Sequence, residues 1–181
     1  MSLDTIKSLL EELRRMGVNV RFGPSVTDAE IAEAESHLGF QLPESYRAFL
    51  RAFGRIELEL VRTWFFYGVG DGIEKAREYA DRFEPLRNDT SGAYYPSRFV
   101  VLMDEGEYSN SASGWVYDAD LKALLHTDGG RYVSRDEAFE GSFMEKLIDE
   151  LKAVRDRVAD PTDELVSGAD DEVNARRKLP G

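Results

Sequence analysis

The chain has 181 residues, 35 of them acidic and 23 basic, for a formal net charge of −12, and it contains no cysteine. This length suits one domain with a short tail. The lack of cysteine excludes disulfides, thiolate nucleophiles and cysteine-based zinc sites. The acidic excess argues against binding to nucleic acid or to anionic membranes. Charges interrupt the first residues and the apolar runs are short, so we expect a soluble, cytoplasmic protein.

The first third of the chain predicts three helices and a short strand. An apolar stripe predicts a helix over residues 2–16, and "VNVRF" alternates as a strand does. Thr27 and Glu30 form a capping-box pattern at the start of a second helix. Pro43 is expected at the first position of the third helix, which ends at Gly54. The buried face of this third helix is expected to consist of Tyr46, Phe49, Leu50 and Phe53.

Strand patterns dominate the middle of the chain. Alternation in "IELELV" predicts a half-exposed strand with Glu57 and Glu59 on its polar side, and "RTWFFYGV" predicts a more buried strand. A helix around residues 73–83 and the loop "RNDTSGAYYPSR" come next. Further strands are expected at "FVVLM", "WVYD", "ALLHT" and "RYVS", and the polar segment "DEGEYSNSASG" is expected to connect the first two.

A last helix is predicted to start near Ser134 or Ser142, because each of these serines is followed three residues later by a glutamate. The apolar pattern dissolves after this helix. We therefore expect a domain over residues 1–158 and a flexible acidic and polar tail over residues 159–181. Helices at both ends with strands between them predict an α+β fold, a single domain with a mixed, mainly antiparallel sheet.

Two patterns raise the question of catalysis. The glycine-rich "GVGDG" at residues 68–72 lacks the spacing and the lysine of a phosphate-binding loop, and Asp71 would repel a phosphate. A turn between a strand and a helix is the favoured interpretation. His37 and His126 are the only histidines, and no spacing implies that they lie together. We therefore expect no catalytic residue, no metal ion and no cofactor.

The candidate binding residues are acidic and aromatic side chains around two of the middle strands. They are the carboxylates Asp104, Glu105, Glu107, Asp118 and Asp120 and the tyrosines Tyr94, Tyr95 and Tyr108. Paired carboxylates can hold a metal ion or transfer protons, but such groups are more often solvated. Tyrosine among carboxylates suits a surface that binds a basic protein. The alternative is that the tyrosines pack against the sheet.

The segment "VTDAEIAEAESHLGFQLPESYRAFLRAFG" resembles the signature of the SUKH superfamily, which includes the fungal Smi/Knr cell-wall-assembly regulators. The matching positions are Ile31, Glu35, Leu38, Gly39, Leu42, Pro43, Tyr46, Phe49, Leu50 and Gly54. The stretches "FYGVG", "FVVLMDEG", "GWVYD" and "SFMEKLIDEL" then follow in the family's order. The resemblance covers roughly residues 24–155.

The resemblance implies an α+β domain that binds proteins and has no catalytic residues. In bacteria, similar proteins are typically immunity proteins that bind and neutralise a cognate toxin, often a nuclease. In fungi, similar domains act as regulators and scaffolds. We therefore expect a non-catalytic domain whose leading partner is a basic toxin, with an intracellular adaptor or regulator as the alternative and an enzyme as the third reading. The oligomeric state is left open.

Overall fold

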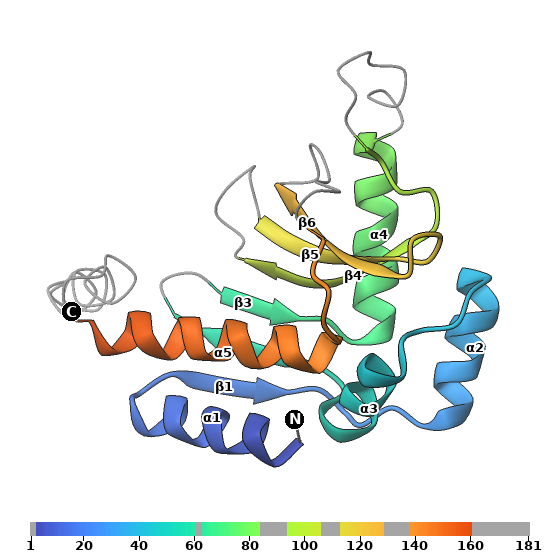
Figure 1. Ribbon diagram of the computed structural model, residues 1–181. Helices are drawn as coiled ribbons and strands as arrows, with labels where there is room; N and C mark the ends of the chain where they lie inside the picture. Colours follow the sequence, from blue (N-terminus) through green and yellow to red (C-terminus); the bar gives the residue numbers. More distant parts are fainter. Residues whose placement is uncertain (1–2, 61–62, 84–93, 106–112, 129–137, 161–181) are drawn as a thin grey trace, which may run out of the picture.

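A computed structural model describes residues 3–60, 63–83, 94–105, 113–128 and 138–160. Within these residues the chain forms five helices and six strands (Figure 1). The helices are α1 (Leu3–Arg15), α2 (Asp28–Leu38), α3 (Glu44–Phe53), α4 (Val69–Phe83) and α5 (Phe143–Ala159). The strands are β1 (Asn19–Phe22), β2 (Ile56–Glu59), β3 (Thr63–Phe66), β4 (Phe99–Glu105), β5 (Ser113–Asp118) and β6 (Ala123–Asp128).

The six strands form one sheet in the order in which they occur in the chain, β1 to β6. Every pair of neighbouring strands is antiparallel. Helix α4 belongs to the connection between β3 and β4. The prediction of an α+β domain with a mainly antiparallel sheet is therefore confirmed, and the described sheet is antiparallel throughout.

The two faces of the sheet carry two separate apolar cores, because successive side chains of a strand point to opposite faces. On the first face, the sheet packs against α1, α3 and α5 in the larger core. On the second face, α4 contributes Ala76 and Tyr79 to a smaller core with Val101, Val116 and Leu125. The helices of the first face thus cover more of the sheet than the single helix of the second face.

Helix α3 buries the face that the sequence predicts. Tyr46, Phe49, Leu50 and Phe53 are all buried. Phe143, at the start of α5, meets the rings of Tyr46 and Phe49 edge-on, with centroid distances of 5.0 and 5.2 Å. Such pairs stabilise a core beyond the area that they bury. The aromatic face therefore joins α3 to α5.

Gly54 ends α3 where another chain segment crosses it. Its φ is +64°, and a Cβ atom at this position would lie 1.8 Å from the carbonyl oxygen of Pro24. No side chain fits there without moving the backbone. The signature glycine is thus required by the close approach of the segment before α2.

Helix α4 starts earlier than predicted. Its first residue is Val69, so Gly70 and Gly72 lie inside the helix, and only Gly68 remains in the expected turn. A Cβ atom on Gly72 would lie 2.5 Å from the carbonyl oxygen of Val101 in β4. The prediction of a glycine-rich turn is therefore wrong for the last four residues of "GVGDG", where Gly72 lets the helix approach the sheet closely.

Helix α5 starts after Ser142, which forms a reciprocal capping box with Glu145. The alternative start at Ser134, the expected strand "RYVS", most of the loop "RNDTSGAYYPSR" and residues 161–181 of the expected tail lie outside the described residues. The described end of the chain is helical through Ala159, one residue beyond the expected domain boundary. None of the described helices combines the length and the apolar character that a membrane crossing requires.

Candidate protein-binding surface

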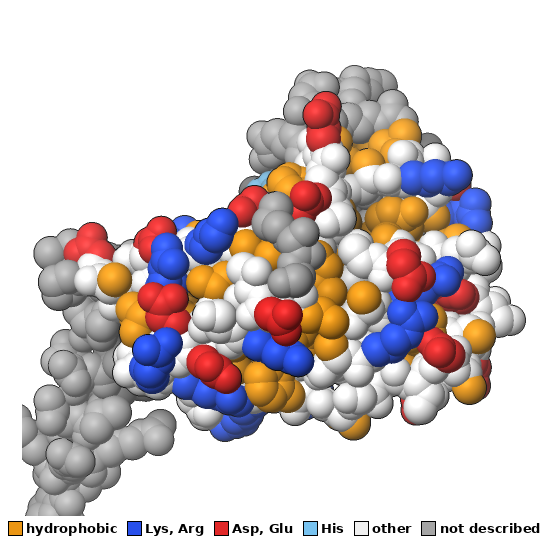
Figure 2. All heavy atoms as spheres, turned by 60° about the horizontal axis from the view of Figure 1, so that its bottom comes forward, with side chains coloured by type: hydrophobic (Ala, Val, Ile, Leu, Met, Phe, Trp, Pro, Cys, Tyr) orange, Lys and Arg blue, Asp and Glu red, His pale blue; other side chains and the backbone are white. Residues whose placement is uncertain are grey.

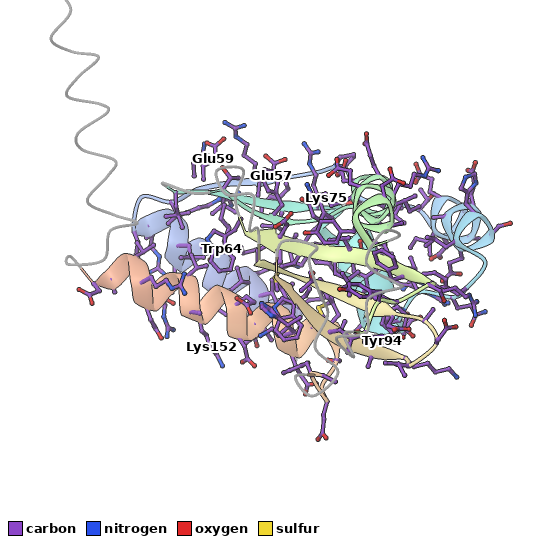
Figure 3. The ribbon with its side chains drawn as sticks, turned by 90° about the horizontal axis from the view of Figure 1, so that it is seen from above. Glu57, Glu59, Trp64, Lys75, Tyr94 and Lys152 are labelled. Atoms are coloured by element: carbon purple, nitrogen blue, oxygen red, sulfur yellow. The ribbon has the colours of Figure 1, made fainter. Side chains whose placement is uncertain are left out.

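The second face of β1, β2 and β3 is the candidate binding surface. We call it the open face and define it by the side chains that point away from α5: Asn19, Arg21, Glu57, Glu59, Thr63 and Phe65. None of these side chains belongs to either apolar core. Figure 3 shows Glu57 and Glu59 on the side of the sheet away from α5, with Lys75 of α4 on the same side.

Strand register arranges the open face in two rows. Arg21 pairs with Glu57, Glu57 with Phe65, and Phe65 with Asp104. The second row is formed by Asn19, Glu59 and Thr63. Paired side chains of neighbouring antiparallel strands lie on the same face, with Cβ atoms about 5 Å apart. The first row therefore places an aromatic ring between two carboxylates.

Ion pairs hold the charged side chains of this region. Arg21 lies 2.6 Å from Glu59, and the two side chains are 58% and 35% exposed. Arg55, just before β2, lies 3.1 Å from Glu57 and 3.5 Å from Asp71 of α4. Exposed pairs of this kind contribute little to stability. Their side chains can exchange ion-pair partners, so a charged group of a binding protein can compete with the internal one.

Phe65 and Tyr67 form an aromatic pair beside these charges. Their rings are parallel, with an interplanar angle of 1° and centroids 5.9 Å apart. Both side chains are half-buried. Burial raises the pKa of Tyr67 well above its ordinary value, and the nearby Asp104 raises it further. Tyr67 thus stays a neutral hydrogen-bond donor over the whole physiological range.

Asp104 lies inside the protein and not on its surface. The residue is 3% exposed, and its Oδ2 accepts hydrogen bonds of 3.4 Å from the hydroxyls of Tyr67 and Tyr79. The ammonium group of Lys75 lies 3.8 Å from the same oxygen. A carboxylate in this position needs such partners to offset its desolvation. The expectation that Asp104 contributes to an exposed binding surface is therefore wrong.

Asp118 and Asp120 organise the turn between β5 and β6. Asp118 is fully buried, accepts a hydrogen bond from Tyr94 and accepts two from the backbone N–H groups of Asp120 and Leu121. Such side-chain caps are typical of turns. The surface role expected for Asp118 is therefore also wrong. Asp120 is exposed and pairs with Arg98 at 3.1 Å.

The structure separates the predicted acidic group. Asp118 is the register partner of Phe99, at the opposite end of β4 from Asp104. Five residues of strand separate these two levels, which corresponds to roughly 16 Å. Tyr94 and Tyr95 are half-buried and pack against the smaller core. Glu107 and Tyr108 lie outside the described residues, as does the side chain of Glu105.

The two histidines occupy different elements. His37 is exposed in the last turn of α2, and His126 lies on β6 with its ring edge-on to Trp115, at a centroid distance of 5.3 Å. In the part of the chain that the structure describes, no three His, Cys, Asp or Glu side chains are placed to hold a metal ion.

Glu57 and Phe65 were missed as candidate binding residues in the sequence. The signal was present, because alternation in "IELELV" predicts that Glu57 and Glu59 point away from the core. No pattern in the sequence indicates which face of which strand lacks a covering helix. The structure provides this information. Helix α4 packs on β4, and among the described elements no helix covers β1 and β2 on this side.

The opposite side of the molecule has a different character. Figure 2 turns the lower side of Figure 1 toward the reader, where Lys and Arg side chains are interspersed with Asp and Glu side chains. On α5, Arg155 contacts Asp156 at 2.6 Å, and Lys152 lies 4.0 Å from Asp149. Both charge signs are present on this side, without one large acidic patch in the view.

Comparison with known proteins agrees with this architecture. The sequence profile of the SMI1 / KNR4 family (SUKH-1) matches residues 25–111, which run from the segment before α2 to the residues after β4. Among curated proteins, no sequence matches the chain significantly. The matched region contains the hinge and aromatic helix of the signature as well as β2 and β3 of the open face. Residues 25–111 are therefore similar to the SMI1 / KNR4 family (SUKH-1), and this match supports membership in the SUKH superfamily.

Proposed function

We propose that this chain is a non-catalytic binding domain that recognises a basic protein toxin and neutralises it. The observation that carries the proposal is the open face, a part of the sheet that combines an aromatic ring with charged side chains and that no described helix covers. Surfaces that bind proteins are enriched in aromatic side chains within a polar surround. The family match supports a domain of this kind.

Electrostatics support a basic partner. The whole chain carries a formal charge of −12. The six side chains that define the open face include the carboxylates of Glu57 and Glu59 and the guanidinium of Arg21, a formal charge of −1, and Arg55 pairs with Glu57 beside them. A nuclease toxin needs a basic surface to hold nucleic acid, and an acidic inhibitor associates quickly with such a surface.

An intracellular adaptor or regulator is the second candidate function. It is supported by the same family match, because the resemblance of the signature segment implies regulators and scaffolds as well as immunity proteins. Both functions use a protein-binding surface without chemistry. They differ in the partner and in what binding does to it.

Co-expression with a toxin domain that is recovered with this chain from its native cell tests the proposal. We expect growth to be restored, and we expect the two purified proteins to elute together from a size-exclusion column. A control strain expresses the toxin with an unrelated acidic protein. If the chain leaves the toxin active and instead co-purifies with a cell-wall or signalling protein, the adaptor function replaces the proposed one.

A further inference from the structure

The ring of Phe65 lies between carboxylates that come from two neighbouring strands. Glu57 of β2 is its register partner on one side, and Asp104 of β4 is its partner on the other. All three side chains therefore point to the same face of the sheet. Asp104 is buried, so Glu57 is the carboxylate beside the ring that a partner can reach. An aromatic ring beside a carboxylate provides the two elements that bind a guanidinium group, a π face and hydrogen-bond acceptors.

The ring of Phe65 is half-buried and pairs with the ring of Tyr67. The ring is parallel to that of Tyr67, so one of its faces is directed at Tyr67. In the described residues no cation lies over Phe65.

Glu57 retains capacity to accept hydrogen bonds. Its Oε1 contacts Arg55 at 3.1 Å, and among the described residues nothing contacts its Oε2. The side chain is only 14% exposed, so its carboxylate is already partly desolvated before a partner binds. A carboxylate in such a position forms stronger hydrogen bonds than one in bulk water.

We propose that an arginine side chain of the partner stacks on Phe65 and donates a hydrogen bond to Oε2 of Glu57. This inference rests on the proposed function, because it names the group of the basic partner that the open face recognises. Arginine fits better than lysine, since a planar guanidinium stacks on a ring while its edge donates hydrogen bonds. A lysine ammonium is a point charge and satisfies only one of these contacts at a time.

The chain uses related contacts within its own fold. The guanidinium of Arg14 lies 4.8 Å from the ring centroid of Phe22, and that of Arg98 lies 5.8 Å from the ring centroid of Phe40. Arg98 also binds Asp120 at 3.1 Å, so it combines a ring with a carboxylate. Phe65 and Glu57 present the same combination, and no arginine of the described residues lies over the Phe65 ring.

Fluorescence anisotropy with labelled peptides tests this inference. The probes are hexa-arginine, hexa-lysine and hexa-citrulline, at an ionic strength of about 0.15 M. Wild-type protein should bind hexa-arginine more tightly than hexa-lysine and should not bind hexa-citrulline. Phe65→Leu and Glu57→Gln should each weaken hexa-arginine binding by about tenfold, because each removes one of the two contacts.

Matched controls separate this site from general attraction to an acidic protein. Phe22→Leu changes a ring that Arg14 already covers, and Glu33→Gln removes an exposed carboxylate on α2. Both controls should bind hexa-arginine within about twofold of wild type. Thermal melts confirm that each variant folds, and the milder Phe65→Tyr keeps the ring if Phe65→Leu does not fold.

The inference is overturned if hexa-arginine does not bind, if lysine and arginine peptides bind equally, or if the site variants behave like the controls. None of these results changes the outcome of toxin co-expression. A chain that neutralises the toxin but fails the peptide test binds its partner by another contact. A chain that passes the peptide test but fails co-expression keeps the guanidinium site and loses the proposed function.

Discussion

At the scale of single residues, Glu35 explains why the segment between α2 and α3 has one conformation. Its Oε1 accepts a 2.7 Å hydrogen bond from the backbone N–H of Leu42 and a 2.8 Å bond from Nε of Arg47. The segment before Pro43 contains a glycine and no other side-chain cap for that N–H. The signature glutamate thus fixes the entry of the chain into the aromatic helix.

Glu35→Gln should lower the free energy of unfolding by about 1–3 kcal/mol, because it replaces charge-assisted hydrogen bonds of a half-buried carboxylate by weaker neutral ones. Urea denaturation measures the difference. The matched control is Glu33→Gln, an exposed position on the same helix, which should change stability by less than about 0.5 kcal/mol. Equal effects of the two substitutions would show that Glu35 has no special role.

Tyr46 links stability to alkaline pH. It is fully buried, and its hydroxyl donates a 2.8 Å hydrogen bond to the carbonyl of Tyr67. Burial raises the pKa of Tyr46 far above its ordinary value, and Asp71 adds to the shift. An unfolded tyrosine has a pKa of about 10. Above that pH the unfolded chain releases a proton that the folded protein retains, so stability falls as pH rises.

Tyr46→Phe should make this loss of stability shallower. At neutral pH the variant should be about 1 kcal/mol less stable, since it lacks one hydrogen bond. Between pH of about 9 and 11 its melting temperature should fall less than that of the wild type. Part of the fall should remain, because burial also raises the pKa of Tyr67. Parallel curves for both proteins would assign the alkaline loss to other groups.

At the scale of elements, antiparallel pairing explains why the predicted acidic site does not exist as a unit. Asp104 lies near the end of β4 and Asp118 lies at the end of β5. Consecutive antiparallel strands run in opposite directions, so their ends lie at opposite ends of the pair. Both residues follow apolar runs in the sequence, which correctly indicated strands. The sequence pattern did not indicate whether Asp104 and Asp118 are buried, and the packing of the fold places both carboxylates in the protein interior.

The helices were predictable where their own periodicity decides their position. The aromatic face of α3 and the capping box of α5 follow from local rules and are present in the structure. The start of α4 was not predictable in this way, because glycine disfavours a helix. At Gly72 the contact of α4 with β4 requires a small residue, so this packing outweighs the low helix propensity of glycine.

Two glycines of α4 test this explanation. A Cβ atom on Gly72 would lie 2.5 Å from the carbonyl oxygen of Val101, whereas a Cβ atom on Gly70 has no atom within 4 Å. Gly72→Ala should therefore destabilise the protein by about 1–3 kcal/mol, because α4 must move away from β4. Gly70→Ala should be neutral or stabilise the protein by up to about 1 kcal/mol, since alanine favours a helix. Thermal unfolding of both variants measures the difference, and a stable Gly72→Ala would refute the close-packing argument.

At the scale of the whole molecule, the two faces of the sheet differ in how far helices cover them, and the proposed binding surface lies on the less covered face. The first face is covered by three helices and contains most of the core. The second face is covered by α4 beside β4, while the open face on β1, β2 and β3 carries mostly exposed or half-buried polar side chains. Substitutions on the open face should therefore alter binding with little effect on folding. The net charge alone does not locate such a surface, because carboxylates occur on both sides of the molecule.

Removing equal charge from opposite sides of the sheet separates local recognition from long-range attraction. Glu57→Gln with Glu59→Gln changes the open face, and Asp149→Asn with Asp156→Asn changes the exposed surface of α5. Both double variants raise the net charge by the same amount. With a basic toxin domain, the open-face variant should associate roughly tenfold more slowly at low salt, and the α5 variant should differ much less.

Stopped-flow measurements at two salt concentrations give these rates. Since screening weakens only the electrostatic part, the difference should shrink at high salt; equal rates for the two variants would place the interface away from the open face.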